Sequence, residues 1–213
     1  VHYSEEPIVE PAAIALYHIS KMAKDKATVL LSGEGADEVF AGYFLYRFMC
    51  ILNKIHAIVP RKSYPLFIYL NKYSSKDKYQ KYMDWLISPL SERYQGTSSY
   101  LTESLKKQYY SDQFFKNKPP YIEDIFKGYF SRVQDLDPLS QMLYVDTKTW
   151  LVDDLLLKAD KMTMATSVEL RVPFLDYRII EAVSGLPPRY KIRNGQGKYL
   201  LKRIVEQLLP HEI

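Results

Sequence analysis

Residues 32–38, which read SGEGADE, place three acidic side chains on a glycine-rich turn directly after an apolar run. Ser32 offers a hydroxyl group, and Gly33 and Gly35 allow the backbone to turn tightly and to approach a ligand closely. Glu34 lies between the two glycines, ahead of the helix that follows, so stabilisation of a helix end does not explain it. A carboxylate presented on such a turn can accept a proton from an attacking amine or meet a cationic group.

The next two acidic residues, Asp37 and Glu38, permit two interpretations. They fall in the first turn of an expected helix, where a carboxylate stabilises the helix by roughly 0.3–1 kcal/mol. They also follow the carboxyl end of an expected strand, which is where open α/β sheets bind their ligands. The residues alone leave both interpretations open.

A second group of charged residues lies far along the chain. Asp154, Lys158 and Lys161 fall at positions i, i+4 and i+7, so they share one face of a helix. Exposed ion pairing, worth roughly a few tenths of a kcal/mol, is one interpretation. The other is a cationic stripe that faces phosphate oxygens, with Asp154 available to Mg²⁺. Glu169 and Arg171 are expected to form a structural ion pair.

A third candidate is Lys198, in the segment RNGQGKY at 193–199. The Asn-Gly pair predicts a tight turn, and a lysine beside the first amides of a helix is a candidate phosphate ligand. The four histidines show no metal-ligand spacing, and nothing resembles a Ser-His-Asp or Cys-His arrangement. We therefore predict no metal site formed by side chains alone.

The elements that must position these residues follow a helix, strand, turn, helix order that is typical of α/β units. The run ATVLL at 27–31 predicts a buried, parallel strand. Pro173 predicts an extended link, and Asp176 is placed as a helix N-cap. Helices are expected over 11–24, 39–58, 137–150, 151–165 and 198–209, with shorter helices and loops over 60–135.

Composition is ordinary for a globular protein: 47% of the 213 residues are hydrophobic and the net charge is +4. This dispersed charge fits a lysine-rich surface better than a nucleic-acid interface, although tyrosines alternate with lysines in the middle of the chain. The single cysteine, Cys50, excludes an internal disulfide and is expected in the core. No apolar run is long enough to predict a membrane span.

Together, four segments resemble the C-terminal synthetase domain of glutamine-hydrolysing asparagine synthetases. They are EEP at 5–7, LSGEGADEVFAGY at 31–43, DDLLLKADKMTMATSVELRVPFLD at 153–176 and GKYLLKRIVEQLLP at 197–210. The resemblance implies an α/β fold of the ATP-pyrophosphatase (adenine nucleotide alpha hydrolase-like) type, dominated by helices with few parallel strands. Residues 1–213 would form part of the synthetase domain, with 60–135 as a variable helical part.

The resemblance also implies a reaction. ATP adenylates the side-chain carboxylate of aspartate with release of pyrophosphate, and ammonia then attacks the β-aspartyl-AMP. Glu34 would be the base for the incoming ammonia, and Asp37, with Glu38, would hold the amino end of the substrate or neighbouring groups. Lys198 would grip the phosphates, completing an expected catalytic set.

Other residues would hold the cofactors, ATP and Mg²⁺. The resemblance implies that Ser32, Gly33 and Gly35 contact the nucleotide and that Glu38 lies beside the substrate or neighbouring groups. Lys158 matches a basic position near pyrophosphate.

Two family features have no match in residues 1–213, namely the Ser-Gly-Gly-x-Asp-Ser pyrophosphate loop and the N-terminal cysteine of the glutaminase half. We therefore expect a longer cytoplasmic parent protein whose glutaminase domain supplies ammonia from glutamine, and no adenylation by residues 1–213 alone. A homodimer is one candidate assembly, and neither nucleic acid nor a membrane is expected as a partner. Two alternatives stay open: a related ligase that forms an amide or lactam on another carboxylate, and a non-catalytic helical interaction module.

Overall fold

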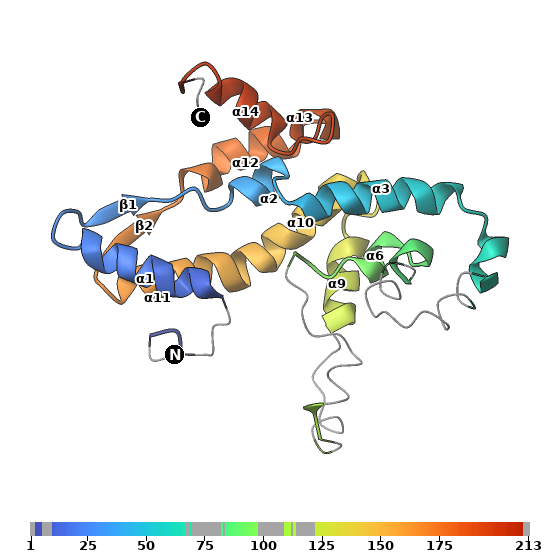
Figure 1. The fold of residues 1–213 in the computed structure, drawn as a ribbon, viewed down its shortest axis with the longest axis horizontal. Coiled ribbons are helices and arrows are strands. Elements are labelled where there is room, and N and C mark those ends of the chain that lie inside the picture. The colour runs from blue at the N-terminus through green and yellow to red at the C-terminus, as the bar shows by residue number, and fades with distance from the viewer. Residues whose placement is uncertain are drawn as a thin grey trace. The chain divides into compact units, whose positions relative to one another are not determined.

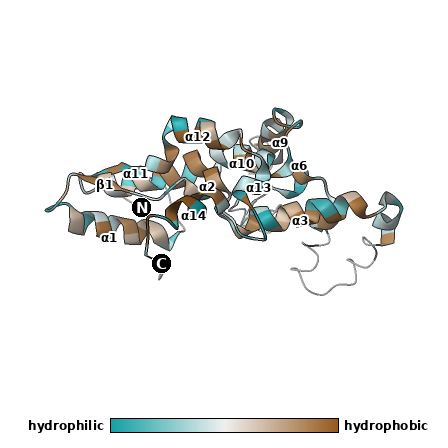
Figure 2. Ribbon diagram, turned by 90° about the horizontal axis from the view of Figure 1, so that it is seen from above, coloured by the Kyte–Doolittle hydropathy of each residue, from teal (hydrophilic) through white to brown (hydrophobic). Residues whose placement is uncertain are grey.

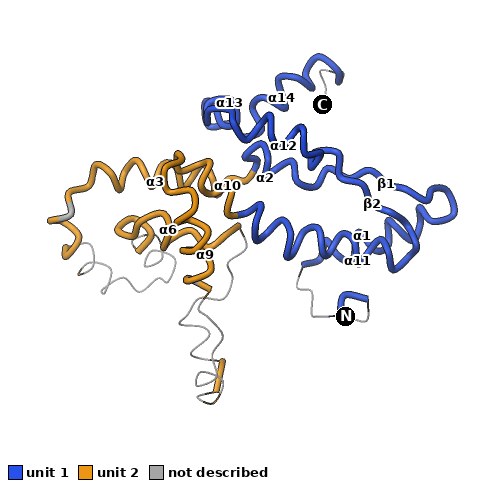
Figure 3. Tube along the Cα trace, turned by 180° about the vertical axis from the view of Figure 1, so that it is seen from behind, with its two compact units in different colours: residues 1–42, 146–213 blue, residues 43–145 orange. Residues whose placement is uncertain are grey.

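The computed structural model describes residues 3–5, 10–66, 69, 82, 84–97, 109–111, 113 and 122–210. The chain divides into two compact units (Figure 3), which are residues 1–42 with 146–213 and residues 43–145. Every residue predicted above as a site residue belongs to the first unit. The expected variable part, 60–135, lies only in part within the described residues and stays a prediction.

The first unit contains a short parallel sheet. Strand β1, Val29–Leu31, pairs with β2, Glu169–Arg171, with Leu30 opposite Leu170. The amide of Ser32 donates to the carbonyl of Arg171 at 2.8 Å, so the pairing continues to the start of the glycine turn. The parallel strand is thus confirmed, but its expected burial is wrong for Leu31, whose side chain is 74% exposed. The described residues place no further strand beside these two.

Helix α1, Pro11–Ala23, and helix α11, Leu157–Met164, lie side by side next to this sheet (Figure 1). Proline at the start of α1 confirms the expected helix start. The buried positions of α1 are the small residues Ala13 and Ser20, and the Ser20 hydroxyl contacts the Thr166 hydroxyl at 2.6 Å. Apolar residues colour parts of the α1 ribbon brown in Figure 2. Three larger apolar side chains of this helix are more than half exposed, namely those of Ile14, Ile19 and Met22.

The expected continuous helix over 39–58 is interrupted. Helix α2, Ala36–Phe40, ends at Ala41, which has a left-handed backbone with φ of 59°. Helix α3, Phe44–Ile58, then begins the second unit. A Cβ atom on Gly197 would overlap the carbonyl oxygen of Ala41, so the break is the place where two backbones approach closely.

The remaining elements of the first unit cover α2. The 3₁₀ turn η3, Pro173–Leu175, replaces part of the expected extended link, and Asp176 accepts from the Arg178 amide at 2.9 Å as the predicted N-cap of α12, Tyr177–Ser184. Helices α13, Pro188–Lys191, and α14, Tyr199–Val205, follow. The predicted last helix is confirmed but ends at Val205, not at 209. A small core unites these elements: Val39, Phe40 and Val183, with Phe174, Leu175, Ile179, Ile180 and Leu201 packed against them.

The second unit is helical in its described part. It contains α3, the turn η1, Arg61–Ser63, and helices α6, Leu90–Arg93, and α9, Ile122–Ser131, and most of α10, Pro138–Lys148. Burial lowers the pKa of Arg93 to about 10, and its guanidinium donates to Asn53 Oδ1 at 2.8 Å. Cys50 is only partly buried, and this burial raises the pKa of its thiol to about 11.

Among the helices that the structure describes, none has the length and apolar character needed to cross a bilayer.

Candidate functional site

The glycine turn follows β1 directly, and its two glycines differ in surroundings. Gly35 has φ of +84°, and a Cβ atom there would overlap the side chain of Leu175. Glycine is therefore required at 35 by the backbone and by packing. A Cβ atom on Gly33 would meet no atom within 4 Å. No atom in the described chain therefore requires glycine at 33.

Glu34 is the half-buried carboxylate of the turn. Its amide donates to the Ser32 hydroxyl at 3.3 Å, which orders the start of the turn. Its Oε2 atom is shielded from solvent and has no hydrogen-bond partner among the described residues. Burial raises the pKa of Glu34, while the charge of Lys158 opposes this rise and that of Asp154 adds to it. The fold thus brings Glu34 into electrostatic contact with the second group of charged residues.

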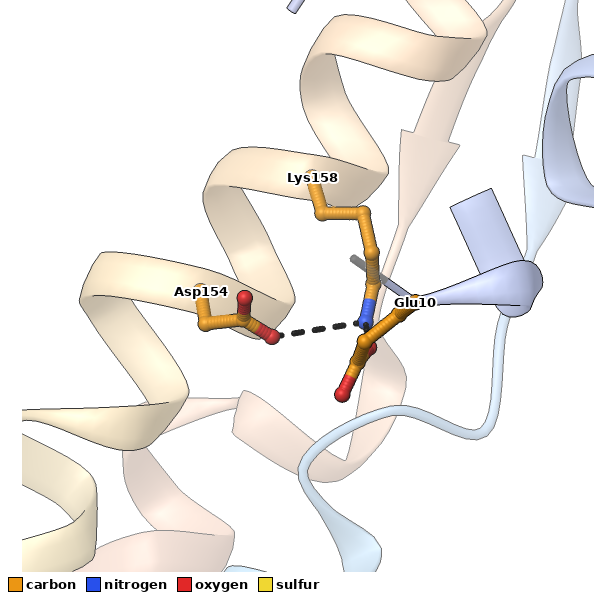
Figure 4. A network of polar contacts seen from close by, with 3 residues as sticks. All are labelled: Glu10, Asp154 and Lys158. Atoms are coloured by element: carbon orange, nitrogen blue, oxygen red, sulfur yellow. Dashed lines mark hydrogen bonds and ion pairs between the residues drawn. The ribbon is translucent and has the colours of Figure 1, made fainter. Parts of the chain in front are cut away.

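Lys158 occupies the first turn of α11, directly after the π-helical segment η2, Leu151–Leu156. Its side chain is only 6% exposed, and its ammonium group lies between the carboxylates of Glu10 and Asp154 (Figure 4), with 3.4 Å to Asp154 Oδ2. Burial acts to lower the pKa of Lys158, but the hydrogen bond and charge of Glu10, together with those of Asp154, raise it overall. Lys158 therefore does not form an exposed ion pair.

Glu10 was missed by the sequence analysis. It immediately precedes Pro11, where an acidic residue ordinarily suggests a helix cap, yet its side chain makes no capping hydrogen bond. Its actual partner, Lys158, lies on a helix near the other end of the chain. No local spacing could have revealed that contact.

Lys161 has different partners from Lys158. It donates to the Ser4 carbonyl at 3.1 Å and to Glu5 Oε2 at 2.6 Å. That hydrogen bond lowers the pKa of Glu5, whose side chain is 81% exposed. The expected cationic stripe is thus engaged by carboxylates at both of its lysines.

Asp37 and Lys198 are brought together from distant parts of the sequence. Their side chains form an ion pair at 3.0 Å, and the Lys198 amide donates to the Phe40 carbonyl at 3.1 Å. Lys198 precedes α14 as predicted, but with a left-handed backbone at φ of 54°. Glu38, by contrast, is completely buried within α2.

The expected ion pair of Glu169 and Arg171 is confirmed at 2.7 Å, with both side chains more than half exposed. Across the described part of the chain, no three His, Cys, Asp or Glu side chains gather in a manner that would hold a metal ion.

The comparison with protein families bears on the whole chain. The family model described as asparagine synthase matches residues 1–213. The chain belongs to the asparagine synthase family. This finding confirms the resemblance that the four sequence segments indicated.

Two relatives of this chain have names that contain the words asparagine synthetase. The "Asparagine synthetase [glutamine-hydrolyzing] 1" of Bacillus subtilis is 38% identical over 215 residues, covering all of this chain and 33% of the relative. The "Putative asparagine synthetase [glutamine-hydrolyzing]" of Mycobacterium tuberculosis is 34% identical over 227 residues, covering all of this chain and 32% of the relative. The chain thus spans about a third of the length of the curated relatives that it matches.

Proposed function

We propose that a longer protein containing this chain converts aspartate to asparagine at the expense of ATP. In the first step, an oxygen of the aspartate side-chain carboxylate bonds to the α-phosphorus of ATP, and the bond to pyrophosphate breaks. In the second step, the ammonia lone pair bonds to the acyl carbon, a proton leaves the nitrogen, and AMP departs with the electron pair of its bond to carbon. The glutaminase domain that would supply ammonia from glutamine belongs to this proposal.

Glu34 is the observation on which the proposal chiefly rests. It presents a half-buried carboxylate at the carboxyl end of a parallel strand, with a shielded oxygen that no described residue engages. Burial raises its pKa, which strengthens it as a proton acceptor once it is ionised. We assign it as the base that takes the proton from the attacking ammonia.

The other residues have supporting roles in this proposal. Ser32 and Gly33 would contact the nucleotide, and Gly35 would hold the shape of the turn. Lys198 would bind phosphate oxygens, which must compete with Asp37 for its ammonium group. When phosphate oxygens replace Asp37 as the partner of Lys198, Asp37 would become free to hold the amino end of the substrate, as predicted above.

Glu38 and Lys158 were predicted to contact the cofactor or the substrate, and that stays a prediction. Glu38 is completely buried, and the ammonium group of Lys158 is enclosed by carboxylates. We therefore propose that both residues stabilise the glycine turn from the side that faces away from the substrate. The described residues do not form a metal site by themselves. Mg²⁺ is commonly held by substrate phosphates with one or two carboxylates.

A direct test uses the longer protein with ATP, aspartate and ammonium ions. We expect asparagine, AMP and pyrophosphate in equal amounts. Glu34→Gln should lower amide formation by about 10²-fold or more while the adenylation of aspartate persists. Absence of asparagine from the wild-type protein, with an amide formed on another carboxylate instead, would support the alternative ligase.

The two glycines provide a matched test of nucleotide binding. Gly33→Ala should leave thermal stability unchanged, because the added methyl group meets no described atom, and should raise the KM for ATP by about tenfold. Gly35→Ala should lower the melting temperature, because residue 35 has positive φ and faces Leu175. An unchanged KM for ATP in Gly33→Ala would exclude close approach of the nucleotide to this residue.

A further inference from the structure

The ammonium group of Lys158 is buried although ammonium is among the most strongly hydrated groups in proteins. Such burial is strongly unfavourable unless the charge is paired. The pairing comes from two elements, because Glu10 precedes α1 and Asp154 lies in the π-helical segment η2. Their side chains are 28% and 36% exposed, so the two carboxylates reach solvent while the lysine between them is buried.

Glu10 is directed away from its own helix. Its backbone is extended, with φ of −82° and ψ of 124°, as expected for a residue that precedes proline. Its side chain makes no hydrogen bond to the first amides of α1 and instead contacts Lys158 of α11. Helix capping therefore does not explain this carboxylate.

The charges around Lys158 are unequal in number. Glu10 and Asp154 both pair with one ammonium group, and the charges of Lys158 and Asp154 both act on Glu34. Glu10 and Asp154 make direct contact with Lys158, whereas Glu34 retains a shielded oxygen that no described residue engages. If Lys158 left this position, Glu34 would face the carboxylate of Asp154 with no positive charge to offset the repulsion.

We propose that Glu10 is a positioning residue for amide formation: through its contact with the Lys158 ammonium group it holds that charge in place for Glu34, the group assigned above to take the proton from ammonia. This inference rests on the proposed function and names a residue that neither the sequence nor the family match singled out. Glu10 acts through Lys158 and does not touch the substrate.

The test compares charge variants in the longer protein. Ammonia-dependent asparagine formation is measured across pH for Glu10→Gln, Glu10→Asp and Asp154→Asn, and aspartate-dependent exchange of pyrophosphate into ATP reports adenylation separately. For Glu10→Gln we expect amide formation to fall by about tenfold or more, while adenylation stays within about threefold of wild type. The acid limb of its pH–rate profile for amide formation should move to higher pH. Glu10→Asp, which keeps the charge, should restore most of the activity.

Asp154→Asn supplies a prediction of opposite sign. Removal of this carboxylate takes away a charge that contributes to raising the pKa of Glu34, while the shorter contact with Glu10 still holds Lys158 in place. The acid limb should therefore move to lower pH. A limb that moved in the same direction as in Glu10→Gln would contradict the arrangement of charges proposed here.

Ser20→Ala is the matched control. It removes a buried hydroxyl contact between α1 and Thr166, beyond the end of α11, and changes no charge. It should lower thermal stability without moving the pH profile. If Glu10→Gln behaved in the same way, or lowered both half-reactions equally, Glu10 would be a structural residue only.

The position of a pH limb does not depend on the concentration of active enzyme, so a variant that folds in part still gives an answer. Failure of the wild-type protein to form asparagine would refute the proposed function. An active wild-type protein with an unshifted Glu10→Gln profile would refute only the role of Glu10.

Discussion

At the scale of single residues, Glu34 combines a chemical use with a cost in stability. Burial raises its pKa, so the folded state favours the protonated form. The stability that this group contributes is present below its ordinary pKa of about 4.5 and is lost as the pH rises through the raised pKa of the folded state. At neutral pH the ionised, shielded carboxylate is therefore destabilising.

We expect Glu34→Gln to unfold at a higher temperature than wild type at neutral pH, with a gain of about 1 kcal/mol or less. The gain should disappear as the pH falls below about 4.5, where the native carboxyl group is protonated as well. Thermal unfolding across pH measures this difference. A variant less stable than wild type at neutral pH would show that the ionised group has a stabilising partner.

At the scale of elements, local patterns predicted much of what the structure shows. Proline at the start of α1, the apolar run of β1 and the cap at Asp176 each depend on a few adjacent residues, and each was predicted correctly. The break at Ala41 was not, because it depends on close approach to Gly197, far away in the sequence. The contacts of Glu10 with Lys158 and of Asp37 with Lys198 were hidden for the same reason.

The close approach at Gly197 leads to a stability prediction. Gly197→Ala places a methyl group against the carbonyl oxygen of Ala41, a backbone atom that cannot move aside, and should destabilise the protein by about 1–3 kcal/mol. Gly185→Ala is the control, because Gly185 has a right-handed helical backbone and open space around it. Chemical denaturation should show a change within about 0.5 kcal/mol for the control.

At the scale of the whole molecule, the candidate site residues gather in one of the two compact units although they come from both ends of the chain. The glycine turn follows β1, whereas Lys158 and Lys198 come from α11 and the start of α14. The chain also covers only about a third of the relatives it matches. We propose that these residues carry out the reaction as part of a longer protein.

Residues 1–213 alone should form no asparagine from ATP, aspartate and ammonium ions, because the sequence has no match to the pyrophosphate loop of the family. The measurement is chromatographic detection of asparagine, with the longer protein as the positive control. Turnover by residues 1–213 would show that they contain a complete adenylation site.

The left-handed backbone of Lys198 has a consequence for protein engineering. At φ of 54° a glycine or asparagine is favoured over lysine, so a stability-guided redesign would select this residue for replacement. Such a redesign would relieve the backbone and delete the ammonium group that Asp37 now holds. Lys198→Gly should thus yield a protein that is at least as stable to heat as the wild type but is inactive. A screen that scores stability alone would select this inactive variant.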